Sequence, residues 1–475
     1  MKKKKIASWL VRGVSSEFSG LDLGDKRLDK RVEVIADALG KNPGLSFPMA
    51  LRTESALEAA YRVFANERVG SEALLESHAE ATRKRAERET EVLVLQDTTS
   101  FRFEGAGREG LGWLHESNKV LQSHFFHAHV ALCVSSGNAG VPLGVVGMRT
   151  FTRKEPARKD RPYKSAALHP DRESARWGKL ALEVEARLQG VRVVHVMDRE
   201  SDQYELLEAF QKRGSHFVIR MHHDRLLDTD EEMRAFECVE MTSGVCEREV
   251  RLSRRTHKKS SRSSKTHPPR LARLAQLSFS ATQVTFQRPK NGPKKNGATL
   301  TVNVVRVWEP EPPPNESPVE WKLLTSEPVE SPEDIIEIVD KYRRRWLIEE
   351  YFKALKSGCA FQKRQLESLS ALEKALALFL PIAWRLLLLR DLSRAVPAAP
   401  ANFLLTSEQL KILNAISEKP LPDVPTVENV AYALARLGGH LKRNGPPGWQ
   451  TLGQGFRTLL QAEIGWMAYQ NRCDQ

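Results

Sequence analysis

The pattern of apolar and polar residues divides the chain into a helical start, a strand-rich middle and a helical end. In the first 70 or so residues, apolar side chains recur every three or four positions, which is the period of an amphipathic helix. One such stripe follows Asp25 and consists of Leu28, Val32, Ile35 and Leu39, and another consists of Leu57, Tyr61 and Phe64. From about Glu91 short apolar runs take over, and after Phe361 the helical pattern returns and continues to the end.

The apolar runs in the middle of the chain predict strands. They are Val92–Leu95, Phe125–Cys133, Val141–Met148 and Val191–Met197. Short Val- and Leu-rich runs bounded by polar residues are typical of buried strands. The first and last runs lead to a carboxylate, Asp97 and Asp198, and we expect each strand to end there, where an acid can reach a ligand. The alternative is that each aspartate begins a loop or caps a helix.

A capped helix is predicted from residue 331 onwards. Ser331 is placed as the N-cap, Pro332 takes the first helical position, and two acids follow in the first turn. Continued through residue 356, a period of 3.6 residues sets five side chains within an arc of roughly 80°. They are Tyr342, Arg345, Glu349, Lys353 and Lys356, and the opposite stripe is Leu347, Tyr351 and Leu355.

This predicted helix face combines one carboxylate with cations and a phenol. Such a set suits a metal ion that faces a phosphodiester, while the alternative is a solvated face of ion pairs four residues apart. The strand-end acids Asp97 and Asp198 favour the catalytic interpretation, because the solvated face does not predict two further acids at strand ends.

The 150 residues between Asp198 and Glu349 contain an alternating pattern that predicts a β-rich region. Alternating strands are expected at Thr299–Trp308 and Val319–Thr325, after a turn at Pro289–Gly297. The basic, Ser-rich stretch Leu252–Lys265 precedes them. It is a candidate DNA contact, although like-charged Ser-rich runs are commonly disordered.

Composition supports a phosphate-binding protein of the cytoplasm. The 475 residues carry 73 Lys and Arg against 60 Asp and Glu, which gives a net charge of +13. The five scattered cysteines include no CxxC pair, so neither a zinc site nor a disulfide framework is indicated. The basic start is not followed by the apolar stretch of a signal peptide. The apolar segment Ala375–Leu389 is too short for a membrane span and contains Pro381 and Arg385, so we interpret it as a buried helix.

Three histidines form an HxxHxH pattern at His124, His127 and His129. On a strand, His127 and His129 share a face and His124 does not, and no second cluster of ligands lies nearby in the sequence. We therefore interpret the segment as a core strand rather than a zinc site.

Four segments resemble the cut-and-paste transposases of bacterial insertion sequences, most closely the IS-Four family of the Tn-Five type. They are LQDTTSF (95–101), VMDRESDQYELL (196–207), WKLLTSEPVES (321–331) and YRRRWLIEEYFKALKSG (342–358). The spacing Tyr-x2-Arg-x3-Glu-x6-Lys is the signature of that group. GDKRLDKR (24–31), AAYRVF (59–64) and AYALARLGG (431–439) extend the resemblance over nearly the whole chain.

The resemblance implies an α/β fold, in which an RNase H-like catalytic core carries the inserted β-rich subdomain and is flanked by helical domains. We expect a helical N-terminal domain at residues 1–70 that binds the transposon end. The catalytic domain covers 71–370, with the insertion at about 230–325. A helical C-terminal domain at 371–475 is expected to dimerise the protein.

The resemblance also implies the chemistry of a DDE transposase. Asp97, Asp198 and Glu349 would hold two Mg²⁺ ions, which Mn²⁺ can replace, because hard oxygen ligands suit these ions. The enzyme would cleave the transposon ends through a hairpin and join them to target DNA. DNA contacts are expected at Tyr342, Arg345, Lys353, Lys356, Trp321, Arg27, Lys30, Arg31 and Arg62.

Within this family, the tryptophan at the position of Trp321 takes a base that is flipped out beside the cleavage point, although Trp321 also fits a packed strand residue. The expected partners are double-stranded DNA, as inverted repeats and target, and a second copy of the chain, with no membrane. The expected location is the bacterial cytoplasm at the nucleoid. Two alternatives stay open: an RNase H-like nuclease without strand transfer, and a catalytically idle DNA-binding copy.

Overall fold

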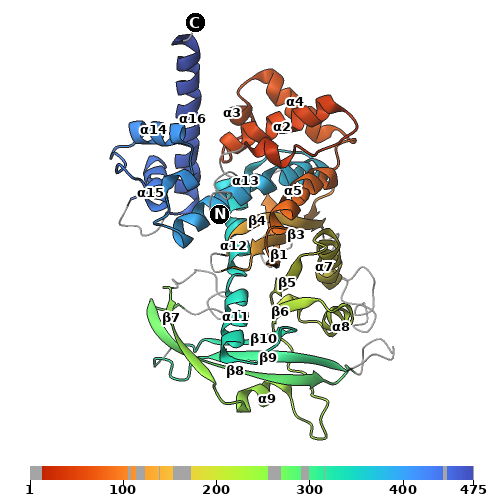
Figure 1. Ribbon diagram of the computed structural model, residues 1–475. Coiled ribbons are helices and arrows are strands. Elements are labelled where there is room, and N and C mark those ends of the chain that lie inside the picture. Colours follow the sequence, from red (N-terminus) through yellow and green to blue (C-terminus); the bar gives the residue numbers. More distant parts are fainter. Residues whose placement is uncertain are drawn as a thin grey trace. The chain divides into compact units, whose positions relative to one another are not determined.

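The computed structural model describes residues 13–104, 108–113, 124–137, 140–152, 173–254, 269–289, 299–314, 316–441 and 447–473 (Figure 1). The chain divides into two compact units. The first consists of Met1–Lys159, Leu182–Arg192 and Trp346–Gln475, and the second of Asp160–Ala181 and Val193–Arg345. The domain boundaries expected from the sequence remain a prediction.

Short helices begin the first unit, in red and orange in Figure 1. They are η1 (Val14–Glu17), α2 (Lys26–Lys41), α3 (Phe47–Leu51), α4 (Glu54–Ala65) and α5 (Ser71–Ala86). Asp25 caps α2 by accepting a hydrogen bond from the Arg27 amide, and Thr53 caps α4 in the same way. The stripe predicted for α2 is largely confirmed, because Val32, Ile35 and Leu39 are buried.

The stripe predicted for α4 is partly wrong. Phe64 is buried, but Tyr61 is 38% exposed and Leu57 is half-buried. The buried face instead runs through Ala60 and Val63. The small side chain of Ala60 allows close packing there, which a count of large apolar residues does not detect.

A buried ion-pair network ties η1 to α5. The Glu17 carboxylate accepts hydrogen bonds from Arg85 at 2.8 Å and lies 2.7 Å from Nδ1 of His78. Burial alone would raise the pKa of Glu17, but the Arg85 charge and the His78 contact lower that pKa to about 2. Glu17 is therefore ionised at neutral pH and holds the N-terminal segment against α5.

The sheet of the first unit is antiparallel. Its strands are β1 (Glu91–Phe103), β2 (Gly112–Trp113), β3 (His124–Ser135) and β4 (Pro142–Phe151), with β3 paired to the other three. Every residue of β3 is buried, including its three histidines, which confirms the core-strand interpretation. His129 contacts the Thr98 hydroxyl at 2.9 Å, and His127 contacts that of Ser100 at 2.9 Å.

The expectation that β1 ends at Asp97 is wrong. β1 stays paired with β3 from Val92 to Phe103, and Asp97 lies opposite Val130 in the middle of the strand. The strand continues because Phe101 and Phe103 are fully buried and both pack edge-on against Phe361. The burial of these two apolar side chains stabilises the part of β1 that follows Asp97.

Helices complete the first unit, and α13 is its central one. They are α12 (Trp346–Lys353), η4 (Ala354–Gly358), η5 (Phe361–Lys363), α13 (Leu369–Ala395), η6 (Ala401–Phe403), α14 (Ser407–Ile416), α15 (Val427–Leu437) and α16 (Trp449–Cys473). Nearly all of Ala375–Leu389 is buried within α13, as the sequence predicts. None of the helices in the described ranges is long and apolar enough to cross a membrane.

The single helix predicted through residue 356 is wrong. Helix α11 (Pro332–Arg343) has the predicted Ser331 cap, but it ends before α12 begins. At the break, the Arg345 amide bonds to the carbonyl of Tyr342, three residues back. Farther on, η4 is a π-helix, in which the Cys359 amide bonds five residues back to Ala354. A tightened turn and a widened turn both change the helical phase, so the segment does not follow one uninterrupted period of 3.6 residues.

The second unit contains one mixed sheet in the order β5-β6-β10-β9-β8-β7. Its strands are β5 (Arg192–Met197), β6 (His216–Arg220), β7 (Cys246–Leu252), β8 (Arg273–Phe286), β9 (Leu300–Trp308) and β10 (Glu320–Thr325). β5 and β6 are parallel, and the other pairs are antiparallel. The strands predicted near residues 299 and 319 are thus confirmed. Most of the predicted basic stretch and turn lies outside the described residues.

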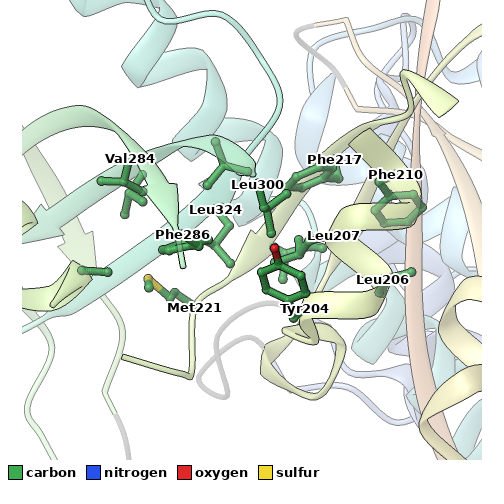
Figure 2. Packing of buried hydrophobic residues seen from close by; sticks show 14 of the residues in the cluster. Tyr204, Leu206, Leu207, Phe210, Phe217, Met221, Val284, Phe286, Leu300 and Leu324 are labelled. Atoms are coloured by element: carbon green, nitrogen blue, oxygen red, sulfur yellow. The ribbon is translucent and has the colours of Figure 1, made fainter. Parts of the chain in front are cut away.

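Helices cover this sheet and close a hydrophobic core. They are α8 (Tyr204–Arg213), α9 (Ala235–Met241), α11 and the start of α7 (Arg176–Arg187), with the 3-10 turns η2 (Glu173–Ala175) and η3 (Arg199–Ser201). Figure 2 shows Leu207 and Phe210 of α8 near Phe217 of β6 and Leu300 of β9. This core fixes the end of β6 relative to β10, and both strands carry residues of the candidate site.

Candidate active site

Asp97 is half-buried on β1 of the first unit. Its Oδ1 atom accepts a hydrogen bond from the Thr98 amide at 2.7 Å. A position inside a paired strand holds the carboxylate more rigidly than a loop would, because the backbone on both sides is hydrogen-bonded to β3.

Glu349 is half-buried on α12, and α12 packs against β1. The strand that carries Asp97 and the helix that carries Glu349 are therefore neighbours within the first unit. Both acids are metal ligands predicted from the sequence.

The next residue, Glu350, anchors α12. Its buried carboxylate accepts hydrogen bonds from Lys353 at 2.6 Å, from the Trp449 indole at 3.2 Å and from Arg390. Burial raises the pKa of Glu350, but Lys353 and Arg390 outweigh that effect and hold the pKa below its ordinary value. α13 and α16 thus fix the helix on which Glu349 is displayed.

Lys353 and Lys356 lie at different places on this segment. Lys353 pairs with Glu350, and its ammonium lies 4.8 Å from the centre of the Trp346 ring. Lys356 lies in the π-helix, 5.7 Å from the centre of the Phe101 ring on β1. Burial lowers the pKa of Lys356, and the charge of Arg102 acts in the same direction. A partly desolvated ammonium of this kind gains more from an arriving phosphate than an exposed one does.

Asp198 belongs to the second unit and directly follows β5, as predicted. Its Oδ1 atom accepts a hydrogen bond from the Glu200 amide at 2.9 Å and so caps the short turn η3. The capping alternative from the sequence is thus realised, and it also fixes the carboxylate at the end of the strand.

Four residues of the second unit form what we call the Tyr342 cluster: Trp321, Tyr342, Arg345 and Arg220. The Trp321 and Tyr342 rings meet edge-to-face, with centroids 5.6 Å apart. The Tyr342 hydroxyl oxygen accepts hydrogen bonds from the guanidinium groups of Arg345 and Arg220. Burial raises the pKa of Tyr342 against the effect of both arginines, and the charge of Asp198 adds to the rise. Asp198 therefore lies close to this cluster.

Arg220 is a residue of this cluster that the sequence patterns do not predict. β5 and β6 are parallel, with Met197 opposite Ile219, so Asp198 and Arg220 leave the same edge of the sheet. Burial lowers the pKa of the Arg220 guanidinium. The sequence does contain a further apolar run, His216–Arg220, that ends on a cation. This run points to the site only once the parallel pairing of β5 and β6 is known.

The cations predicted to bind DNA in the N-terminal helices are exposed. Arg27, Lys30 and Arg31 lie on α2, and Arg62 lies on α4. Arg27, Lys30 and Arg62 make surface ion pairs with acids two to four residues away. Exposed pairs contribute little to stability, so phosphates can replace the acids at small cost.

The described residues contain no group of three or more His, Cys, Asp or Glu side chains placed to hold a metal ion. Asp97 and Glu349 are in the first unit and Asp198 is in the second. All three are carboxylates, the donor type that Mg²⁺ and Mn²⁺ prefer, so the donor set fits a hard divalent ion.

Two family models match the chain. The Transposase DNA-binding model matches residues 9–69, and the Transposase DDE domain model matches residues 171–382. The chain is therefore a DNA-binding DDE transposase, with the pair of domains typical of the IS-Four family. Enzymes with this domain use divalent metal ions.

Among solved structures, the chain is similar to a piggyBac transposase synaptic complex with hairpin DNA, determined by cryo-EM. The TM-score is 0.33 at 11% sequence identity, and the match covers 83% of this chain and 73% of the other. The assignment rests on the family models and not on this distant likeness.

Proposed function

We propose that the chain cleaves both strands at the ends of its own transposon and joins the freed ends to target DNA. The observation that carries the proposal is the Tyr342 cluster beside Asp198, because it gathers two guanidiniums, a phenol and an indole next to a strand-end carboxylate. Such a set can hold a phosphodiester by charge, by hydrogen bonds and by stacking at one place.

The proposed metal ligands are Asp97, Asp198 and Glu349, arranged in an RNase H-like catalytic core. Two Mg²⁺ ions, or Mn²⁺ in their place, would activate the attacking oxygen and stabilise the leaving oxygen of an in-line displacement. The packing of α12 on β1 supports the pairing of Asp97 with Glu349. Glu350 supports it further, because its contacts with α13 and α16 hold α12 in place.

The proposed reaction begins with the attack of water on one strand at the transposon end, which releases a 3′-hydroxyl. That hydroxyl attacks the opposite strand, and the bond to the flanking DNA breaks as a hairpin forms. A second water opens the hairpin, and the regenerated 3′-hydroxyl attacks a target phosphodiester. Each step exchanges one phosphorus–oxygen bond for another, so no oxidant or energy source is needed.

The proposal assigns the DNA contacts to three regions. The Tyr342 cluster, with Lys356 and Lys353, holds the phosphates next to the cleavage point. The exposed cations Arg27, Lys30, Arg31 and Arg62 contact the end duplex farther away. Trp321 supports a flipped base, which is compatible with its half-buried position against Tyr342.

We also propose that the protein acts as a homodimer at the bacterial nucleoid. The support is the apolar surface near the end of α16, where Trp466 is 46%, Met467 51% and Tyr469 63% exposed. Exposed aromatic residues that lie close together are typical of protein interfaces.

The proposed phosphate contacts of Arg345 and Lys356 can be tested by the salt dependence of end binding. We expect Arg345→Ala and Lys356→Ala each to reduce the slope of log K against log salt by about one, because each loses a phosphate contact. The measurement is fluorescence anisotropy of a labelled end duplex. Lys411→Ala, an exposed lysine on α14, is the control with an unchanged slope. Unchanged slopes and full activity in both variants would contradict the assignment of Arg345 and Lys356 to phosphate contacts.

Trp321 can be tested by separating the nick from the hairpin. We expect Trp321→Ala to leave the rate of the first nick unchanged and to slow hairpin formation. Hairpin formation needs sharp distortion of the strand, and the variant removes a stacking platform worth roughly 1–3 kcal/mol. Trp321→Phe should recover part of the rate. Denaturing gels of a labelled end resolve both products. If Trp321→Ala lowers the melting temperature and both steps fall equally, Trp321 serves only as a packing residue.

A further inference from the structure

An open groove in the second unit is not used by the reaction proposed above. It has a volume of about 540 Å³, and its lining includes Arg176, Arg199, Glu200, His222 and His223. We call it the His222–His223 groove. All of its lining residues belong to the second unit, so its geometry does not depend on how the two units are placed.

The groove is electropositive. Glu200 is its acidic lining residue, and it forms an ion pair with Arg176, whose side chain is only 11% exposed. Because the charges of Glu200 and Arg176 cancel, the positive charge of Arg199 remains. Arg199 and the two histidines are exposed to solvent. Neutral histidine donates a ring N–H, and protonated histidine adds a charge, so the surface suits an anion with several acceptor oxygens.

Asp202 holds the two histidines in position. Its carboxylate is fully buried, and Oδ2 accepts hydrogen bonds from the backbone amides of His222 at 2.6 Å and His223 at 2.8 Å. Arg225 lies 2.7 Å from the other carboxylate oxygen and also donates to the Asp202 carbonyl at 3.0 Å. Because a buried, charge-paired carboxylate binds both backbone amides, the segment that carries the two histidines is rigid. A rigid segment loses little conformational entropy when a ligand binds.

The groove and the Tyr342 cluster share neighbouring residues along two strands. β6 delivers Arg220 to that cluster, and the chain then runs through Met221 to the two histidines. Two residues of chain span at most about 7 Å, so the backbone of His222 lies near that of Arg220. On the adjacent strand, Asp198 is followed directly by Arg199, which lines the groove.

We propose that the His222–His223 groove binds the phosphate backbone of the duplex DNA outside the transposon end, next to the phosphodiester held by the Tyr342 cluster. Asp202 is a positioning residue for this contact. The inference rests on the proposed function, since it needs a DNA end at the cluster. Backbone contacts of this kind are independent of sequence, which suits DNA that differs at every insertion site.

The test compares two labelled duplexes that bind the full-length protein in EDTA. Both carry the inverted repeat that borders the reading frame, and one ends at the repeat while the other continues by one helical turn of flanking DNA. We expect the double variant His222→Ala with His223→Ala to bind the flanked duplex roughly tenfold more weakly. Its salt slope should fall by about one to two. Binding of the duplex without a flank should be unchanged.

Two further variants sharpen the comparison. Asp202→Asn should weaken binding of the flanked duplex in the same selective way, since it disturbs the turn without touching DNA. Lys212→Ala removes an exposed lysine of α8 in the same unit and should change neither duplex. Circular dichroism checks that the histidine variant is folded, which its exposed positions lead us to expect.

A second arm distinguishes donor from target DNA. Protein saturated with repeat duplexes that lack a flank is titrated with a labelled random-sequence duplex, which represents target. If the histidine variant loses affinity only for the flanked duplex, the groove binds donor DNA. If it also loses affinity for the random-sequence duplex, the groove binds target DNA as well. Equal losses on flanked and unflanked repeats, or no loss in either arm, overturn the proposal. A native protein without preference for the repeat over random DNA contradicts the proposed function instead.

Discussion

Alanine in place of Asp97, Asp198 or Glu349 should abolish end cleavage in each case while leaving end binding nearly intact. Each carboxylate would contribute several kcal/mol of charge stabilisation in the transition state, so we expect a loss of roughly a thousandfold or more. DNA recognition is assigned to other side chains. In a gel mobility-shift assay, the variants should therefore bind a labelled end duplex as the native protein does. The measurement is Mg²⁺-dependent nicking of a labelled end.

Glu205→Ala is the matched control for these variants. Glu205 is an exposed acid on α8 in the same unit as Asp198, and its loss should leave nicking unchanged. Robust Mg²⁺-dependent nicking by any of the three alanine variants would remove that residue from the metal site.

Gly455→Ala should strongly destabilise the C-terminal helices. A Cβ atom at Gly455 would lie 1.6 Å from the carbonyl oxygen of Leu434, and one at Gly438 would lie 1.9 Å from that of Thr451. α15 and α16 therefore cross with their backbones in contact. The added methyl group must push the helices apart, and overpacking of this kind typically costs about 1–3 kcal/mol, or more where backbone atoms block the way.

The measurements are the midpoint of thermal unfolding and the molar mass in solution. The midpoint should fall by several degrees. Gly465→Ala in the same helix is the matched control, because a Cβ atom there has nothing within 4 Å. That change should be neutral or stabilising by about 0.5–1 kcal/mol. A thermal midpoint for Gly455→Ala equal to that of the control would contradict the close helix crossing.

Local chemistry makes some elements predictable from the sequence. Ser331 and Asp334 form the predicted cap, in which each side chain bonds to the backbone of the other residue. Asp198 ends its strand as expected, because the apolar run stops there. The buried α13 follows from an apolar segment that is too short and too polar to be a membrane span.

Interactions with distant residues explain the errors. β1 passes Asp97 because Phe101 and Phe103 find Phe361, more than 250 residues later. No Gly or Pro marks the break after Arg343, so a periodic pattern continues through it. Arg220 could not be found without the parallel register of β5 and β6. Glu350 likewise acquires its role only when α13 and α16 bring Arg390 and Trp449 to it.

The most direct test of the account is a reaction with a plasmid that carries the element and its bordering inverted repeats. The purified protein is incubated with this plasmid and a separate target plasmid, with Mg²⁺ or with EDTA, and the products are resolved on native and denaturing gels. We predict Mg²⁺-dependent excision of a fragment whose ends pass through a hairpin, followed by its joining to the target plasmid, with none of these products from Asp198→Ala. Excision without joining, or products that persist in EDTA or with Asp198→Ala, would contradict the account.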